Sequence, residues 1–231
     1  STTSASFSTD MVIGAVDGNS TSEAVVAGYS FQIDLNTSFT GDDSLDISLD
    51  AGNAGGALSE LDLNTGSDSL SVDGVSYAFP LGDSITAFVG DNTDGSLLFS
   101  TACVYGGVTN VLDDCGNGNA AIAASLGTAA GASIDMGDGW AAGIGYEGTQ
   151  GSDGLMTKEG LDAYAAQISY NSDSYGASIT YAMIETSTTA ETTYWAFNGY
   201  WAPSETGSVP SISVGYEVGD PTTGSDTEQL F

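Results

Sequence analysis

Carboxylates are almost the only side chains in this sequence that could do chemistry. The 231 residues include 31 acidic residues, a single basic residue (Lys158) and no histidine, for a formal charge of −30 at pH 7. Two carboxylates can act as general acid and general base when their environments separate their pKa values. Adjacent acids such as Asp42 and Asp43 point to opposite sides of an extended chain, so solvation and repulsion account for them without catalysis. We therefore predict that the protein is not an enzyme.

The missing side chains exclude further functions. Without histidine there is no Ser-His-Asp or Cys-His nucleophile system and no imidazole metal ligand. Nucleic-acid binding requires Lys and Arg to neutralise phosphates, and one lysine cannot supply this. We expect no nucleic-acid partner and no cofactor.

One loop contains two other candidate sites. The segment Asp91–Gly95 (DNTDG) has the oxygen-rich composition of a calcium loop, with Asp91 and Asp94 as ligands, but the downstream glutamate of an EF-hand is absent. A solvated loop is the simpler interpretation. Cys103 and Cys115 lie in a Gly/Asn/Asp-rich stretch without a CxxC motif, which predicts a local disulfide and an oxidising compartment.

The elements that must position these residues are β-strands. From Tyr29 to Phe39, apolar and polar residues alternate with a period of two. No apolar run approaches the ~18 residues of a transmembrane helix. The predicted strands are 6–16, 23–39, 44–51, 72–79, 84–90, 120–136, 140–148, 163–170, 175–185, 192–202 and 209–218, with a twelfth from about Glu228.

The connections between these strands alternate in length. Short ones are expected at 40–43, 80–83, 137–139 and 171–174, and long ones at 52–71, 91–118 and 149–162. Tight turns on one side and long loops on the other are typical of outer-membrane barrels. The fold class predicted for residues 1–231, taken as one domain, is an all-β, antiparallel, up-and-down transmembrane β-barrel or a large part of one.

Aromatic residues recur in pairs six positions apart. The pairs are Trp140 and Tyr146, Tyr164 and Tyr170, Tyr175 and Tyr181, and Tyr194 and Tyr200. An even spacing places both members on one face of a strand. Two aromatic girdles would give such pairs, with Ile168 and Ile179 facing lipid between them. The alternative is a soluble sandwich with aromatics at its strand ends.

The positions opposite the apolar stripes are small or polar. The candidate pore-lining residues are Asp34, Asp46, Asp50, Gln167 and Glu217. An interior of this kind suits water, although a sheet with one solvated face gives the same alternation. The loop 91–118 either folds into the lumen or remains a surface loop.

Two motifs resemble a known family. Residues 29–53, YSFQIDLNTSFTGDDSLDISLDAGN, and 77–90, YAFPLGDSITAFVG, are similar to barrel hairpins of cyanobacterial outer-membrane porins of the carbohydrate-selective type. The resemblance implies a homotrimeric diffusion porin in contact with outer-membrane lipid. It also implies a barrel with more strands and a surface-layer-homology domain, so residues 1–231 are expected to be a segment of it.

The predicted function is an outer-membrane channel for small solutes or inorganic ions, with an acidic lumen that favours cations. The alternative is an extracellular, acidic, β-rich structural, adhesive or surface-layer protein. Solubility separates the two, because a barrel requires detergent.

Overall fold

The computed structural model describes residues 2–15, 24–58, 61, 63, 68–100, 116–123, 126–149, 154–203 and 209–231. Within these ranges, β-strands account for nearly all of the regular structure. The strands are β1 (Thr2–Gly14), β2 (Val26–Ser38), β3 (Ser44–Gly52), β4 (Ser71–Pro80), β5 (Ile85–Asp91), β6 (Gly127–Gly137), β7 (Trp140–Thr149), β8 (Asp162–Asn171), β9 (Tyr175–Ser187), β10 (Ala190–Trp201), β11 (Ile212–Pro221) and β12 (Thr227–Leu230). The helical elements are a 3-10 turn, η1 (Gly56–Leu58), and a short helix, α1 (Asn119–Ile122). None of the described helices is long and apolar enough to cross a membrane.

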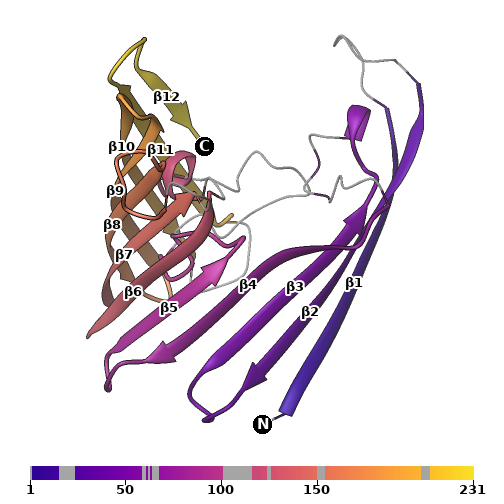
Figure 1. Ribbon diagram of the computed structural model, residues 1–231, viewed down its shortest axis with the longest axis horizontal. Coiled ribbons are helices and arrows are strands. Elements are labelled where there is room, and N and C mark those ends of the chain that lie inside the picture. Colours follow the sequence, from indigo (N-terminus) through magenta and orange to yellow (C-terminus); the bar gives the residue numbers. More distant parts are fainter. Residues whose placement is uncertain are drawn as a thin grey trace. The chain divides into compact units, whose positions relative to one another are not determined.

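The strands form one up-and-down antiparallel sheet. Each strand is hydrogen-bonded to the next along the chain, from β1 to β12 (Figure 1). In this order β1 and β12 are the end strands. The chain divides into two compact units, with the boundary in β4 between Tyr77 and Ala78.

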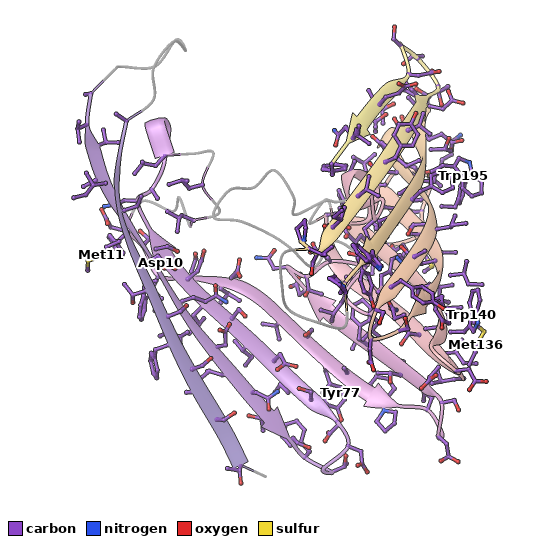
Figure 2. All side chains as sticks on the ribbon, turned by 180° about the vertical axis from the view of Figure 1, so that it is seen from behind. Asp10, Met11, Tyr77, Met136, Trp140 and Trp195 are labelled. Carbon is purple, nitrogen blue, oxygen red and sulfur yellow. The ribbon has the colours of Figure 1, made fainter. Side chains whose placement is uncertain are left out.

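In the first unit, the register of β1, β2 and β3 places like residues side by side. Phe7 of β1 lies opposite Ile33 of β2, which lies opposite Leu49 of β3. On the other face, Ser6 lies opposite Asp34. Figure 2 shows the neighbouring residues Asp10 and Met11 on opposite sides of β1. Each strand therefore has one apolar and one polar face, as the period-two alternation predicts.

In the second unit, the same alternation is clearest in β8 and β9. In β8 the exposed side chains are Tyr164, Ala166 and Ile168, and the residues between them are buried. The buried face is covered by α1, whose Ala121 and Ile122 pack against Ala163, Ala165 and Ala182. One face of this sheet is therefore covered by the chain itself, and the opposite face is not.

Most of the predicted strands are confirmed, including the short connections 39–43, 81–84, 138–139 and 172–174. The prediction of a strand over 120–136 is wrong at its start, because residues 119–122 form α1 and β6 begins at Gly127. A run of small residues shows no strong hydrophobic periodicity, so its secondary structure is hard to predict. Residues 119–122 form a helical turn, because the small alanine side chains allow it to pack closely on the sheet. The tight turn at 188–189 lies in the later part of the chain, where the connections are expected to be closer in length and to blur the alternation.

Candidate pore wall and its covering loop

Three of the predicted pore-lining acids share the polar face of the first unit. In the β2–β3 register, Asp34 lies opposite Ser48 and Asn36 lies opposite Asp46. Asp50 lies opposite Gln32, two positions further along the same face. The alternation of the two strands therefore brings Asp34, Asp46 and Asp50 together, all of them half-buried.

Hydroxyl and amide groups hold these carboxylates in place. Asp34 Oδ1 accepts hydrogen bonds from Gln32 Nε2 and Ser48 Oγ, both at 2.8 Å. Asp46 accepts from Asn36 Nδ2 at 2.6 Å and Ser44 Oγ at 2.5 Å, and Asp50 accepts from Ser71 Oγ at 2.7 Å.

The chemistry of this face follows from its charges. No lysine or arginine occurs between residues 1 and 157, so the donors to these acids are neutral and the negative charges are not cancelled. Fixed acids without basic partners create a negative potential that attracts cations.

The polar face of the second unit is instead covered. Its largest polar side chains are Glu147 of β7, Gln167 of β8, Thr180 of β9, Asn198 of β10 and Glu217 of β11, all of them buried. Gln167 lies opposite Thr180 in the β8–β9 register. Asn198 and Glu217 lie within two positions of Thr180 in the register of β9 to β11, and Glu147 lies four positions from Gln167, opposite Ala163. We call these five side chains the polar stripe.

Segments of the connection between β5 and β6 lie on the polar stripe. Glu147 Oε1 accepts a hydrogen bond from the backbone N–H of Gly95 at 2.8 Å, and its Oε2 accepts from Leu126 N–H at 3.2 Å. Glu217 Oε2 accepts from Gly118 N–H at 2.9 Å. Two carboxylates therefore fasten this connection to the sheet at separate points.

Amide side chains fasten the same connection between those points. Gln167 accepts from the N–H of Ser100 at 2.7 Å and donates to Asn117 Oδ1 at 2.7 Å. Asn198 Nδ2 donates to the carbonyl of Gly116 at 3.0 Å. The backbone groups that would otherwise be buried without partners are thus paired with the wall.

Small residues in the sheet make room for the connection. A Cβ atom at Gly145 of β7 would overlap the carbonyl oxygen of Gly95, and a Cβ at Gly143 would come within 2.9 Å of the Phe99 ring. The backbone of the covering segment therefore approaches the strand at a distance that only glycine permits.

Two of the predicted pore-lining residues hold the covering segments, together with two residues that were not predicted. Gln167 and Glu217 lie on the predicted face, but they are 5% and 3% exposed and hold the covering segments. Glu147 and Asn198 are anchors that the sequence analysis missed. Glu147 could have been suspected, because it is the only acid in a glycine-rich and alanine-rich strand.

The uncovered face of the second unit carries two rows of aromatic rings. The turn-side belt consists of Trp140, Tyr170, Tyr175 and Trp201, and the loop-side belt consists of Tyr146, Tyr164, Tyr181 and Trp195. Within the loop-side belt, Tyr146 is buried, at 8% exposure, and the other three side chains are exposed. Ring centroids are 5.2 Å apart for Trp140 and Tyr170, and 5.3 Å apart for Tyr146 and Tyr164. Figure 2 shows Trp140, Trp195 and Met136 projecting from this unit.

Apolar side chains fill the space between the belts. Ile168 and Ile179 lie opposite each other in the register and are 45% and 44% exposed. Exposed Ile144, Phe197 and Val214 continue the band on the neighbouring strands. The predicted exposure of Ile168 and Ile179 between two aromatic rows is confirmed.

One predicted aromatic pair lies on the wrong face. Tyr194 packs against the core around α1, and Tyr200 donates its hydroxyl to the carbonyl of Ser172 at 2.5 Å. The outward pair in β10 is Trp195 and Trp201, which has the same six-residue spacing. Because aromatic residues occupy both faces of β10, spacing alone could not choose between them.

The remaining candidates are not assembled into a site by the described residues. Asp91 Oδ1 accepts a hydrogen bond from the Asn92 N–H at 3.0 Å. Among the described residues, no group of three or more acids or cysteines could hold a metal ion. Cys103 and Cys115 lie outside the described residues.

Comparisons with known proteins give a weak likeness in structure. No family model matches the chain, and no curated protein matches it either. Similar solved structures include an anion-selective porin from Comamonas acidovorans, with 13% identity, TM-score 0.49, and coverage of 99% of this chain and 82% of that one. A loop-deletion mutant of OmpT, an outer-membrane protein of Vibrio cholerae, has 11% identity, TM-score 0.46, and coverage of 99% and 86%. A mutant porin of Rh. blastica has 8% identity, TM-score 0.43, and coverage of 99% and 88%. With TM-scores below 0.5, these likenesses carry no argument about the function of this chain.

Proposed function

We propose that the chain is the wall of an outer-membrane diffusion channel that admits small solutes and favours cations. The observation that supports this most directly is the two aromatic belts with exposed isoleucines between them. Aromatic girdles on either side of an apolar band are the pattern of a strand wall in contact with lipid. Contiguous exposed apolar surface of this kind is rare on soluble monomers and marks a contact with a membrane or another protein.

The polar faces support the channel. In the first unit, hydroxyl groups, amides and the carboxylates of Asp34, Asp46 and Asp50 occupy the face opposite the apolar residues. A face of this composition is stable against water and not against lipid. In the second unit, the segments of the connection that bond to Glu147 and Glu217 on the polar face support a loop that folds into the lumen.

Cation preference follows from the charges on this wall. Walls of low dielectric constant focus the field of fixed charges and raise the local concentration of counterions. The Debye length is ~8 Å at physiological ionic strength, which is comparable with a pore radius. The preference should therefore hold at physiological salt and decrease at high salt.

The test is the reversal potential of the reconstituted channel in a salt gradient. We expect a cation-selective sign, which the double variant Asp34→Asn with Asp46→Asn should weaken. The control is Asp42→Asn, which removes a carboxylate from an exposed turn and should leave the reversal potential unchanged. An anion-selective or non-conducting protein would contradict the proposal.

The second candidate is an acidic extracellular structural or adhesive protein. The charge and the antiparallel sheet are compatible with it. The exposed band between the belts favours the membrane instead. Extraction distinguishes them, since a membrane wall stays with the lipid until detergent is added and a secreted protein does not.

We also propose a porin type, an oligomeric state, a disulfide and a pair of calcium ligands. The motifs at 29–53 and 77–90 support a porin of the cyanobacterial carbohydrate-selective type, which implies a homotrimer. The Gly-rich context of Cys103 and Cys115 supports a disulfide. Asp91 and Asp94 are proposed calcium ligands only on the composition of their loop.

A further inference from the structure

The loop between β7 and β8 is fastened to the outer edge of the loop-side belt. The hydroxyl of Tyr146, a belt residue, donates to Asp162 Oδ1 at 2.5 Å, and the N–H of Met156 donates to the same oxygen at 3.2 Å. Thr149 and Leu161 exchange two hydrogen bonds of 2.9 and 3.0 Å at the base of the loop. Residues 154–161 are therefore held beside the belt.

This loop exposes two large apolar side chains. Leu155 and Met156 are 42% and 68% exposed, and Met156 has a φ of 57°. A left-handed backbone is uncommon for a residue with an unbranched apolar side chain. The loop thus presents apolar surface next to a band that already has this character.

Lys158 follows these two residues and is exposed. It is the only lysine or arginine in a chain of formal charge −30. Positive side chains at the edge of an apolar band attract the phosphates of anionic lipids, each contributing about a fivefold preference.

We propose that Leu155, Met156 and Lys158 form an interfacial lipid contact, in which Lys158 binds the phosphate of an anionic membrane lipid. Leu155 and Met156 enter the boundary of the acyl region beside Tyr146. Continuity with the aromatic belt fixes the position of this contact, and charge complementarity fixes the partner, since the rest of the chain repels anions. The inference rests on the proposed membrane function.

The experiment measures how strongly the full-length chain retains phosphatidylglycerol relative to phosphatidylcholine. The protein is reconstituted in mixed vesicles, extracted, and its bound lipids are counted by native mass spectrometry. We expect Lys158→Gln to lower the preference for phosphatidylglycerol about fivefold. Lys158→Arg should retain the preference, and Glu159→Gln, at the adjacent exposed position, should not lower it.

Two further measurements show whether the retained ligand is a lipid or free phosphate, and whether a failure concerns the lipid contact or the membrane function. Excess inorganic phosphate should not displace the retained lipid, because the apolar side chains contribute to holding it. An equal preference in wild type and Lys158→Gln, or displacement by free phosphate, would overturn the inference while leaving the channel intact. Failure of the wild-type protein to insert into phosphatidylcholine vesicles would overturn the proposed function and the inference together.

Discussion

The hydroxyl of Tyr77 donates a 2.6 Å hydrogen bond to Asp43 Oδ2. The other carboxylate oxygen of Asp43 accepts from the N–H groups of Phe39 and Thr40 at 2.9 and 2.8 Å, and from Ser38 Oγ at 2.7 Å. One acid thus joins the turn between β2 and β3 to strand β4. Figure 2 shows Tyr77 on β4, within the first unit.

This arrangement predicts acid sensitivity of the turn. The Tyr77 hydroxyl, followed by the Thr40 N–H, holds the pKa of Asp43 below its usual range. Because the folded pKa lies below the unfolded value of about 3.9, the ionised carboxylate stabilises the fold fully above that value, and this stabilisation is lost progressively as the pH falls from there through the folded pKa. Denaturant midpoints measured from about pH 3 to pH 7 should show this loss in wild type.

Each variant for this experiment removes a single hydroxyl or carboxylate group from the wild-type protein. Tyr77→Phe and Asp43→Asn should lower the midpoint at neutral pH and flatten its dependence on acid. Asp42→Asn, at the neighbouring exposed position, should retain the wild-type profile. An unchanged acid dependence in Asp43→Asn would show that other carboxylates cause it.

Charge placed in the band between the belts should destabilise the membrane-bound protein. Ile168→Arg or Ile179→Arg is expected to cost ~2–4 kcal/mol in unfolding free energy, because this is the cost of arginine near the bilayer midplane. Unfolding in lipid vesicles measures it. Thr188→Arg, in the exposed turn between β9 and β10, is the control and should cost little. Equal costs at 168 and 188 would mean that the band faces water.

A methyl group at Gly145 should disturb the covering connection. Gly145→Ala places a Cβ against the carbonyl oxygen of Gly95, and overpacking of this kind costs ~1–3 kcal/mol. We expect lower thermal stability together with a larger single-channel conductance, since the connection must move off the wall. Gly199→Ala is the comparison variant and should disturb the fold less, because its Cβ would lie 3.3 Å from the Gly176 carbonyl oxygen, which has to shift by only a few tenths of an ångström. Wild-type conductance in Gly145→Ala would show that the connection does not limit flow.

The cysteine prediction has a direct readout. A bridge between Cys103 and Cys115 makes the intact mass under non-reducing conditions lower by two hydrogen atoms than after reduction. Two thiols that alkylate freely in the native protein would contradict the bridge.

The sequence predicted most strands because the pleat imposes a period of two, and side chains such as Phe31 and Asp34 follow it closely. The same period placed Gln167 and Glu217 on the polar face. It could not show that they are covered, since the covering segments come from a connection whose path depends on distant contacts. The helix α1 was missed for a related reason, because alanine-rich segments acquire their conformation from the surface on which they pack.

The anchoring of the covering connection also constrains the order in which the protein assembles. Gly95 and Glu147 are 52 residues apart in the chain, and Gly118 and Glu217 are 99 residues apart. Contacts of such long range form slowly, because the entropy of closing the loop is lost before the contact is gained. The second anchor cannot form until β11 has joined the sheet. The connection should therefore reach its final position late, when nearly all the strands are already in place.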